Sequence, residues 1–155
     1  MEDLERAVAR VVYGYAERLD AGDVTGAAEI LAPARWKRTP DDIGITGTDA
    51  IAEFLDSSVS RYDDGTPRTK HLVTNLVIEH DEKVPHQARA RSYFVALQQL
   101  DDFPLQPIMA GRFHDWFEHV DGEWRLMERV IFADLFGDVS HHIRNDSPAT
   151  TGSTS

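Results

Sequence analysis

The chain changes its hydrophobic period before its middle, from the spacing of helices to the alternation of strands. Between residues 3 and 20 the apolar side chains recur at helical spacing, which predicts an amphipathic helix that ends at Ala21-Gly22. The same reasoning predicts a short helix over residues 24–31 and a third helix that opens at Gly47-Thr48. Helices are therefore expected in the first part of the chain.

Alternation with a period of two begins at residue 68 and continues through most of the following sequence. Apolar and polar side chains alternate in this way along a strand whose two faces have different surroundings. Asp121-Gly122 is the strongest hairpin signal of the chain. The pattern predicts long antiparallel strands over residues 68–80, 86–100, 107–120 and 123–134, in addition to a short strand at 35–38.

Helices followed by antiparallel strands predict an α+β fold in which helices cover one face of a curved sheet. The 155 residues suffice for one domain with a hydrophobic core and are too few for two. We expect this domain to span residues 1–138 and to be followed by a flexible tail at 139–155. Residues 145–155 are rich in Ser, Thr, Pro and Gly and are expected to be disordered.

The last predicted strand is apolar on both faces. A sheet with one solvated face should carry polar side chains there. We therefore expect the helices to cover one face and a second subunit to cover the other, in a homo-oligomer. The two apolar sets are Trp124, Leu126, Val130 and Phe132 on one face, and Met127, Ile131 and Ala133 on the other.

Composition and charge argue against several classes of function. The formal net charge of −11 is unlike that of nucleic-acid-binding proteins, which usually show a basic patch. The sequence has no cysteine, no secretory signal and no apolar run of about 18 residues, so we expect a cytoplasmic protein that is not embedded in a membrane. Motifs for metal or nucleotide binding are missing, and His141-His142 is a poor metal site beside a flexible tail. No metal and no cofactor are expected.

His71 is the most informative residue of the strand predicted at 68–80. It shares an otherwise apolar strand face with Asn75, and a polar side chain there needs a hydrogen-bond partner. Asp20, at the end of the first helix, is a candidate partner that would orient the imidazole and stabilise its protonated form after proton abstraction. The alternatives are a structural histidine whose hydrogen bonds are satisfied and a solvated carboxylate in a turn.

Arg129 is the third candidate, because an arginine on a largely apolar strand face rarely lacks an anionic partner. It could stabilise a leaving group or a developing oxyanion, or it could form an ion pair with a nearby acid or extend to the rim of the sheet. Tyr15 could place a phenol in a cavity, although core tyrosines are more often structural, and Asn75 could orient a carbonyl.

Several stretches of the chain resemble the SnoaL-like branch of the nuclear transport factor 2 superfamily. The resemblance covers roughly residues 3–136 and includes the order of helices and strands. It implies a cone-shaped α+β barrel of the cystatin-like type, in which a curved sheet wraps around helices and encloses one apolar pocket. The stretches that carry it are Tyr-Ala-Glu-Arg-Leu-Asp-Ala-Gly-Asp at 15–23, Gly-Thr-Asp-Ala-Ile-Ala-Glu-Phe-Leu at 47–55, Thr-Lys-His-Leu-Val-Thr-Asn at 69–75, Gly-Arg-Phe-His-Asp at 111–115 and Asp-Gly-Glu-Trp-Arg at 121–125.

Among the enzymes of that superfamily, the chain looks most similar to scytalone dehydratase and to the cofactor-free hexachlorocyclohexane dehydrochlorinase. In both, a strand histidine paired with an aspartate at the end of helix one abstracts a proton, and His71 and Asp20 occupy those places. Arg129 matches an arginine of the dehydrochlorinase, whereas Tyr15 and Phe113 stand where that enzyme has a lysine and a tyrosine. The resemblance thus implies the same base and leaves the substrate and the leaving group open.

These observations lead to one functional hypothesis and to alternatives. We expect a cofactor-independent lyase or isomerase, of the dehydratase type, in which His71, Asp20 and Arg129 act on a small apolar or polycyclic substrate. The alternatives are a polyketide cyclase or ketosteroid-isomerase-like enzyme, and a non-catalytic ligand-binding module or accessory subunit of a ring-hydroxylating oxygenase. The expected oligomer is a trimer or a dimer. The residues expected to bind substrate are Tyr15, Trp36, Asn75, Phe113, Met127 and Ile131.

Overall fold

Three helices precede the long strands in the computed structural model, which describes residues 3–144. The helices are α1 (Leu4–Asp20), α2 (Val24–Leu31) and α3 (Thr48–Ser58). The strands are β1 (Arg35–Lys37), β2 (Ile45–Thr46), β3 (Thr69–His80), β4 (Gln87–Leu100), β5 (Phe103–Val120) and β6 (Glu123–Phe136). Within the described range, no helix is long and apolar enough to cross a bilayer.

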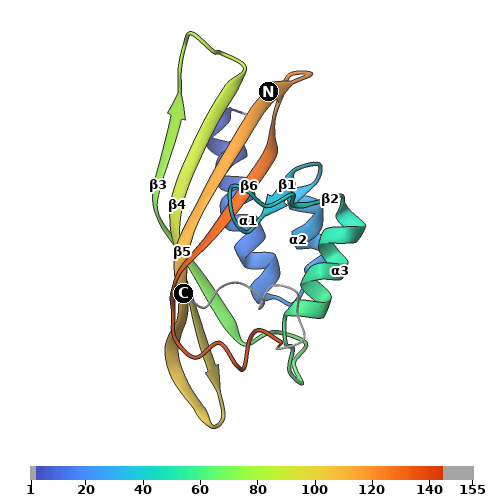
Figure 1. Ribbon diagram of the computed structural model, residues 1–155, viewed down its shortest axis with the longest axis vertical. Helices are drawn as coiled ribbons and strands as arrows, with labels where there is room; N and C mark the ends of the chain where they lie inside the picture. Colours follow the sequence, from blue (N-terminus) through green and yellow to red (C-terminus); the bar gives the residue numbers. More distant parts are fainter. Residues whose placement is uncertain (1–2, 145–155) are drawn as a thin grey trace.

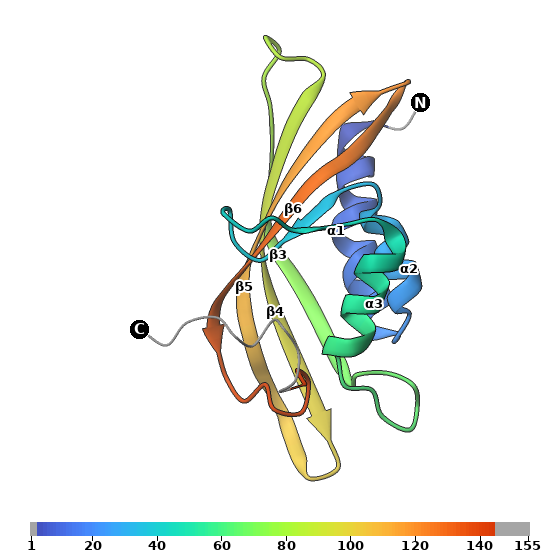
Figure 2. The same ribbon diagram turned by 45° about the vertical axis from the view of Figure 1, so that its right-hand side comes forward.

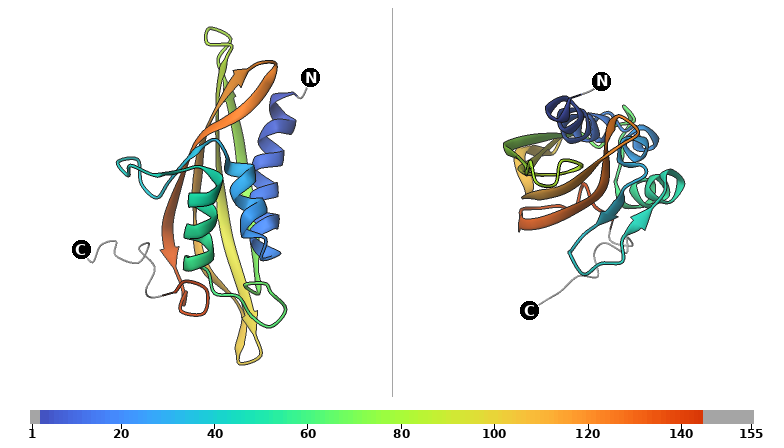
Figure 3. Two further views of the ribbon diagram at one scale, coloured as in Figure 1. Left: turned by 90° about the vertical axis from the view of Figure 1, so that its right-hand side faces the viewer. Right: turned by 90° about the horizontal axis from the view of Figure 1, so that it is seen from above.

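The strands form one sheet with the order β2-β1-β6-β5-β4-β3, in which β1 lies parallel to β6 and the other neighbours are antiparallel. All three helices lie on the same face of this sheet (Figure 1, Figure 2). The view from above shows how strongly the sheet is curved (Figure 3). The predicted α+β class, with a curved and mostly antiparallel sheet around the helices, is confirmed.

The helix α1 supplies one side of the hydrophobic core. Its N-terminus is capped by Asp3, whose carboxylate accepts a hydrogen bond from the backbone N–H of Arg6 at 2.8 Å. One face of the helix is almost completely removed from water, and this burial is the main source of its stability in the fold. The buried side chains are Ala7, Val8, Val11, Val12, Tyr15 and Ala16.

The strand β5 begins at Phe103, earlier than the predicted start at residue 107. Asp101-Asp102 alone forms the turn after β4, and Phe103 already pairs with Leu100. A proline removes one ladder hydrogen bond, so it is tolerated where a strand has an open edge. Pro104 satisfies this condition, because β5 pairs with β6 only from residue 109 onwards.

One-residue bulges reverse the alternation of side chains once along β3 and twice along β6; the first of each strand matters for the site. In β3 the register with β4 shifts after Thr74, and Asn75 has a left-handed backbone with a φ of 54°. In β6 the residues Leu126 and Glu128 face consecutive residues of β5, so Met127 is the extra residue. Because strand side chains alternate with a period of two, each extra residue moves the side chains that follow it, up to the next bulge, to the opposite face.

The bulge at Met127 changes the expected arrangement of apolar side chains on β6. Trp124 and Leu126, which precede the bulge, belong to the core beneath the helices, and Ile131, which follows it, packs against the same core. The bulge therefore explains part of the apolar pattern that the sequence shows on both faces of this strand. The part of the molecule that the structure describes still exposes apolar side chains on several strands, among them Leu72, Val77, Tyr93, Leu105 and Leu135.

Residues 137–144, which we call the C-terminal strap, return from the end of β6 to the end of α3 (Figure 1). Ile143 forms a β-bridge with Val59, and the carbonyl oxygen of His142 accepts a hydrogen bond from the backbone N–H of Ser60 at 2.8 Å. The sequence analysis expects a flexible tail from residue 139, whereas residues 139–144 are hydrogen-bonded to the domain. The stretch expected to be disordered, residues 145–155, lies outside the described residues.

Candidate active site

The turn after α1 brings Asp20 to the edge of the sheet. Gly22 has a φ of 77°, and a Cβ atom at this position would lie 2.1 Å from the carbonyl oxygen of Gly65. Only glycine allows the backbone to approach the loop before β3 this closely. The end of α1 and the first residues of β3, including Thr69, consequently lie side by side.

Three hydrogen bonds hold the Asp20 carboxylate in place. Its Oδ1 atom accepts from the Thr69 hydroxyl at 2.8 Å and lies 2.6 Å from Nδ1 of His71. Its Oδ2 atom accepts from the backbone N–H of His71 at 2.8 Å. The side chains of Asp20 and His71 are each 10% exposed. The carboxylate therefore binds both the main chain and the ring of the same histidine, which fixes the orientation of the ring.

The electrostatics of this pair determine which imidazole nitrogen is available for chemistry. Burial raises the pKa of Asp20, but the hydrogen bonds and charge of His71, together with the bond from Thr69, outweigh burial and leave the pKa below its ordinary value. An ionised carboxylate can only accept hydrogen bonds, so Nδ1 of His71 carries the hydrogen of their contact. The lone pair of the neutral ring is then on Nε2, which can accept a proton.

His71 borders a cavity of about 480 Å³ between the helices and the inner face of the sheet. Ligand pockets in proteins usually measure roughly 300–1,000 Å³ and are mainly apolar with a few polar groups. The polar side chains that line the cavity are Tyr15, Arg38, Ser58, His71 and His142. The apolar ones are Leu19, Trp36, Phe54, Leu55, Val59, Phe94, Met109, Phe113, Ile131, Ala133, Phe136 and Ile143.

Tyr15 contributes a phenol that stays protonated at neutral pH. Burial raises its pKa to about 12, against the opposing effect of the Arg129 cation. Its ring packs edge-on against Phe113 with 6.3 Å between the ring centroids. Trp36, which also lines the cavity, packs against Phe54 at 4.9 Å between centroids. Of the residues expected to bind substrate, Tyr15, Trp36, Phe113 and Ile131 line the cavity.

Arg129 lies behind the cavity wall and does not line the cavity. Its Nε and Nη2 atoms donate to the two carboxylate oxygens of Asp115 at 2.7 and 2.8 Å, and both side chains are buried, at 0% and 1% exposed. The guanidinium carbon lies 4.2 Å from the ring centroid of Phe113 and 5.1 Å from that of Tyr15. The ion pair considered in the sequence analysis is thus the observed arrangement, and direct contact of Arg129 with a substrate is not supported.

Asn75 and Met127 also lie away from the cavity, although both are expected to bind substrate. Each is located at the bulge of its strand, where the simple alternation of faces fails. Asn75 is exposed, so it no longer shares the face of His71. The regular strand assumed in the sequence analysis placed both residues on the wrong face for the cavity.

The sequence analysis missed several residues that the structure brings into the cavity. Phe94 stacks on Phe113 at 4.7 Å between ring centroids, and the alternation of charged and apolar side chains in the first half of β4 could have indicated its inward position. His142 borders the cavity from the C-terminal strap. No local pattern marks this histidine, because its position depends on the contacts of the strap with α3 and the residues that follow it.

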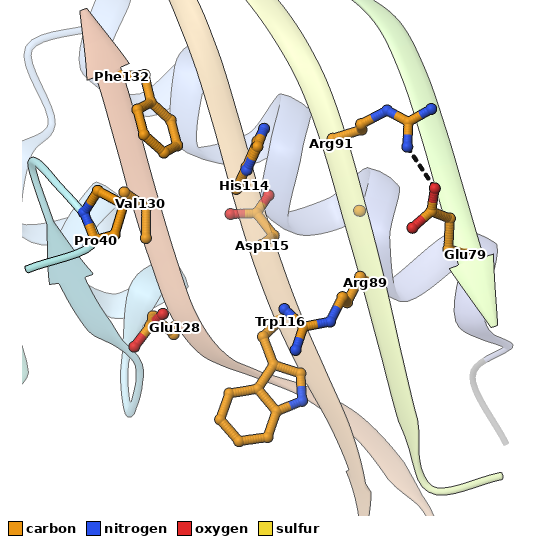
Figure 4. A pocket seen from close by; sticks show the side chains of 11 residues that line it. Pro40, Glu79, Arg89, Arg91, His114, Asp115, Trp116, Glu128, Val130 and Phe132 are labelled. Carbon is orange, nitrogen blue, oxygen red and sulfur yellow. Dashed lines mark hydrogen bonds and ion pairs between the residues drawn. The ribbon is translucent and has the colours of Figure 1, made fainter. Parts of the chain in front are cut away.

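A second depression, of about 330 Å³, lies on the other face of the sheet (Figure 4). Figure 4 shows Arg91 and Glu79 in an ion pair at one side of it, with His114, Trp116 and Phe132 along the strands. Burial and the nearby Arg112 lower the pKa of His114. No group of three or more potential metal ligands is found among residues 3–144. The cavity beside His71 is therefore the better candidate for chemistry, because it combines an oriented base with a mainly apolar lining.

Comparison with known proteins identifies the family and the fold of this chain. The family described as "SnoaL-like domain" matches residues 3–130, whereas no curated protein sequence matches the chain.

Among solved structures, a "Putative Scytalone Dehydratase" from Novosphingobium aromaticivorans is 24% identical with a TM-score of 0.63, covering 86% of each chain. ActVI-ORFA from Streptomyces coelicolor is 17% identical with a TM-score of 0.64, covering 84% of this chain and 97% of its own. An NTF2-like protein with a cystatin-like fold, also from N. aromaticivorans, is 16% identical with a TM-score of 0.61, covering 86% and 91%. At these identities the structures establish the shared fold.

Proposed function

Since this chain belongs to the SnoaL-like domain family, we propose that it is a cofactor-independent lyase or isomerase. In this proposal, His71 is the general base, Asp20 orients it, and the substrate is a small apolar or polycyclic molecule bound in the cavity. The observation that carries the proposal is the contact of 2.6 Å between Nδ1 of His71 and Asp20 at the wall of an apolar cavity. Similarity to a structure described as a scytalone dehydratase agrees with a dehydratase-type reaction.

The proposed reaction begins when Nε2 of His71 removes a proton from a carbon beside a carbonyl or a leaving group. The N–H bond forms as the C–H bond breaks, and the electron pair moves to the carbonyl oxygen or into a new double bond as the leaving group departs. Asp20 stabilises the imidazolium that results. The imidazolium then returns the proton to another carbon in isomerisation, or to the departing hydroxide in dehydration, which regenerates the base.

The alternatives differ in what they require of the same residues. A polyketide cyclase or ketosteroid-isomerase-like enzyme would use the same base on another carbonyl substrate. A ligand-binding module or accessory subunit would need His71 and Asp20 only as a structural hydrogen bond. The position of His71 at the wall of the cavity favours an enzyme, because a purely structural pair has no need to face a ligand.

Deuterium exchange into 2-tetralone tests the proposed base without knowledge of the natural substrate. The C1 hydrogens of this bicyclic ketone lie between a carbonyl and an aromatic ring, so a general base can remove them. In D₂O, we expect the protein to accelerate their exchange at least about 10²-fold over an equal concentration of free imidazole, measured by the loss of the C1 signal in ¹H NMR.

The matched control is His80→Gln, which removes an exposed histidine from the same strand and should leave the rate unchanged. Binding of the ketone is followed separately by the fluorescence of Trp36, which lines the cavity. A protein that binds 2-tetralone but exchanges it no faster than imidazole would contradict a catalytic base. A protein that does not bind the ketone at all would contradict the proposed substrate class.

We also propose that the exposed sheet face forms a homo-oligomer, a trimer or a dimer. Leu72, Tyr93 and Leu135 are exposed apolar side chains on three different strands, and an apolar surface of this kind is typical of an interface. Light scattering coupled to size-exclusion chromatography should give a mass of two or three chains at micromolar concentration. The double substitution Tyr93→Lys and Leu135→Lys should shift this mass towards one chain, whereas a wild-type monomer would contradict the proposal.

A further inference from the structure

His142 faces the same cavity as His71 and has no role in the mechanism described above. Its side chain is buried, with 9% of the residue exposed, and its ring centroid lies 6.2 Å from that of His71. The Nδ1 atom is shielded from solvent and has no hydrogen-bond partner among the described residues. Because Nδ1 is shielded from the cavity as well as from solvent, a hydrogen on it would have no acceptor, which leaves Nε2 as the nitrogen that can carry the donor.

The position of this imidazole is fixed by its own backbone. The N–H of His142 donates to the carbonyl oxygen of Val139 at 3.0 Å, and its carbonyl oxygen accepts from Ser60 at 2.8 Å. The next residue, Ile143, pairs with Val59 at the end of α3. The neighbouring carbonyl of His141 accepts from the side-chain nitrogen of Gln98 at 3.1 Å. The C-terminal strap therefore holds the ring at a defined place opposite His71.

The cavity also determines the charge of the ring. Burial, with a smaller contribution from His71, lowers the pKa of His142 to about 4, although Asp20 acts in the other direction. His142 is therefore neutral at physiological pH, and a neutral imidazole carries one N–H donor and one acceptor. A neutral donor in an apolar cavity suits an uncharged oxygen atom and does not attract a carboxylate or a phosphate.

We propose that the imidazole of His142 donates a hydrogen bond to an uncharged oxygen of the substrate, next to the carbon from which His71 removes a proton. The inference rests on the proposed function and narrows its substrate class to ketones or related compounds with such an oxygen. The two rings lie on the cavity wall at a separation that a C–C=O unit can bridge, given hydrogen-bond reach of roughly 2.6–3.2 Å at the oxygen. When the proton leaves, charge develops on this oxygen, and the N–H of His142 stabilises it.

A pair of ligands that differ only in the oxygen isolates this hydrogen bond. The dissociation constants of 2-tetralone and of its hydrocarbon, tetralin, are measured for each variant, and their ratio expresses the preference for the oxygen. The two free ligands are hydrated in the same way whichever variant is measured. A change in the ratio between two variants therefore reports a change in the cavity alone. His142→Phe should reduce the preference for 2-tetralone about 3- to 10-fold, the expected contribution of one neutral hydrogen bond.

Two further variants serve as controls for this measurement. His142→Gln keeps an N–H donor and should retain most of the preference, whereas His80→Gln removes an exposed histidine that does not line the cavity and should leave the preference unchanged. An unchanged ratio in His142→Phe would overturn the inference, and so would an equal loss in His80→Gln. A crystal structure of the unsubstituted protein with 2-tetralone gives an answer even if His142→Phe does not fold. The ketone oxygen should lie within hydrogen-bond distance of the His142 ring, and an oxygen directed at Tyr15 would contradict the proposal.

The outcomes separate this inference from the proposed function. If the protein exchanges deuterium but His142→Phe keeps the full preference for 2-tetralone, only the role of His142 is wrong. If the preference falls in His142→Phe but the protein does not accelerate exchange, the cavity recognises an oxygen without a catalytic base.

Discussion

Replacing His71 by glutamine should lower the exchange of deuterium into 2-tetralone by about 10²- to 10⁴-fold, the usual contribution of a general base. Glutamine is close in size and can keep the hydrogen bond to Asp20, but its side-chain amide is not basic. The cavity and the binding of the ketone should therefore persist while proton transfer is lost. The rate is measured by ¹H NMR at a saturating concentration of ketone, so that binding and chemistry are separated.

Replacing Asp20 by asparagine should cause a loss in the same range while His71 is still present. The asparagine amide can donate to Nδ1, and His71 would then carry its hydrogen on Nε2, the atom that must accept the proton. The substitution also removes the negative charge that stabilises the imidazolium. The expected result is a strong reduction of the rate at unchanged ketone affinity, which is the behaviour of a mis-oriented base.

Thr69→Val provides the matched control for this pair of substitutions. It removes one of the three hydrogen bonds to Asp20 and leaves the contact of 2.6 Å with His71 in place. The exchange rate should fall much less than in Asp20→Asn. Circular dichroism verifies that all variants are folded. Exchange at the wild-type rate in either His71→Gln or Asp20→Asn would show that the pair is structural.

Replacing Arg129 by methionine should destabilise the protein by about 3–5 kcal/mol, because the substitution leaves the buried Asp115 carboxylate without its partner. Burial lowers the pKa of the Arg129 guanidinium, but the attraction of Asp115 outweighs burial and raises this pKa overall, so the guanidinium stays charged. Asp115→Leu should cause a loss of the same order for the same reason. The free energy of unfolding is measured by urea denaturation.

The double variant Arg129→Met with Asp115→Leu tests the explanation. With both charges removed, no buried charge is unpaired, and the double variant should be considerably more stable than either single one. Arg112→Met is the control on the same sheet, because Arg112 pairs with Asp134 in a similar geometry but in an exposed position. It should lose much less stability. Additive losses in the double variant would contradict the interpretation of the pair as a coupled unit.

The sequence determined the helices and the long strands of this fold to within a few residues, but not the short strand β2. Helical spacing in residues 3–20 corresponds to α1, and the alternation after residue 68 corresponds to the long strands β3 to β6. These signals are local, because each element must separate its apolar side chains from its polar ones along its own length. His71 and Asp20 were recognisable for a related reason, since a polar side chain at the end of a helix or on an apolar strand face stands out from its neighbours.

Apart from the expected pair of His71 and Asp20, only the tertiary structure decided which side chains meet. The bulges at Asn75 and Met127 insert one residue each, and alternation along the sequence does not show where such an insertion occurs. The pairing of Arg129 with Asp115 follows from the register of β5 and β6, which depends on both strands at once. His142 enters the cavity because the strap returns to α3, so its position depends on hydrogen bonds between residues that are distant in the chain.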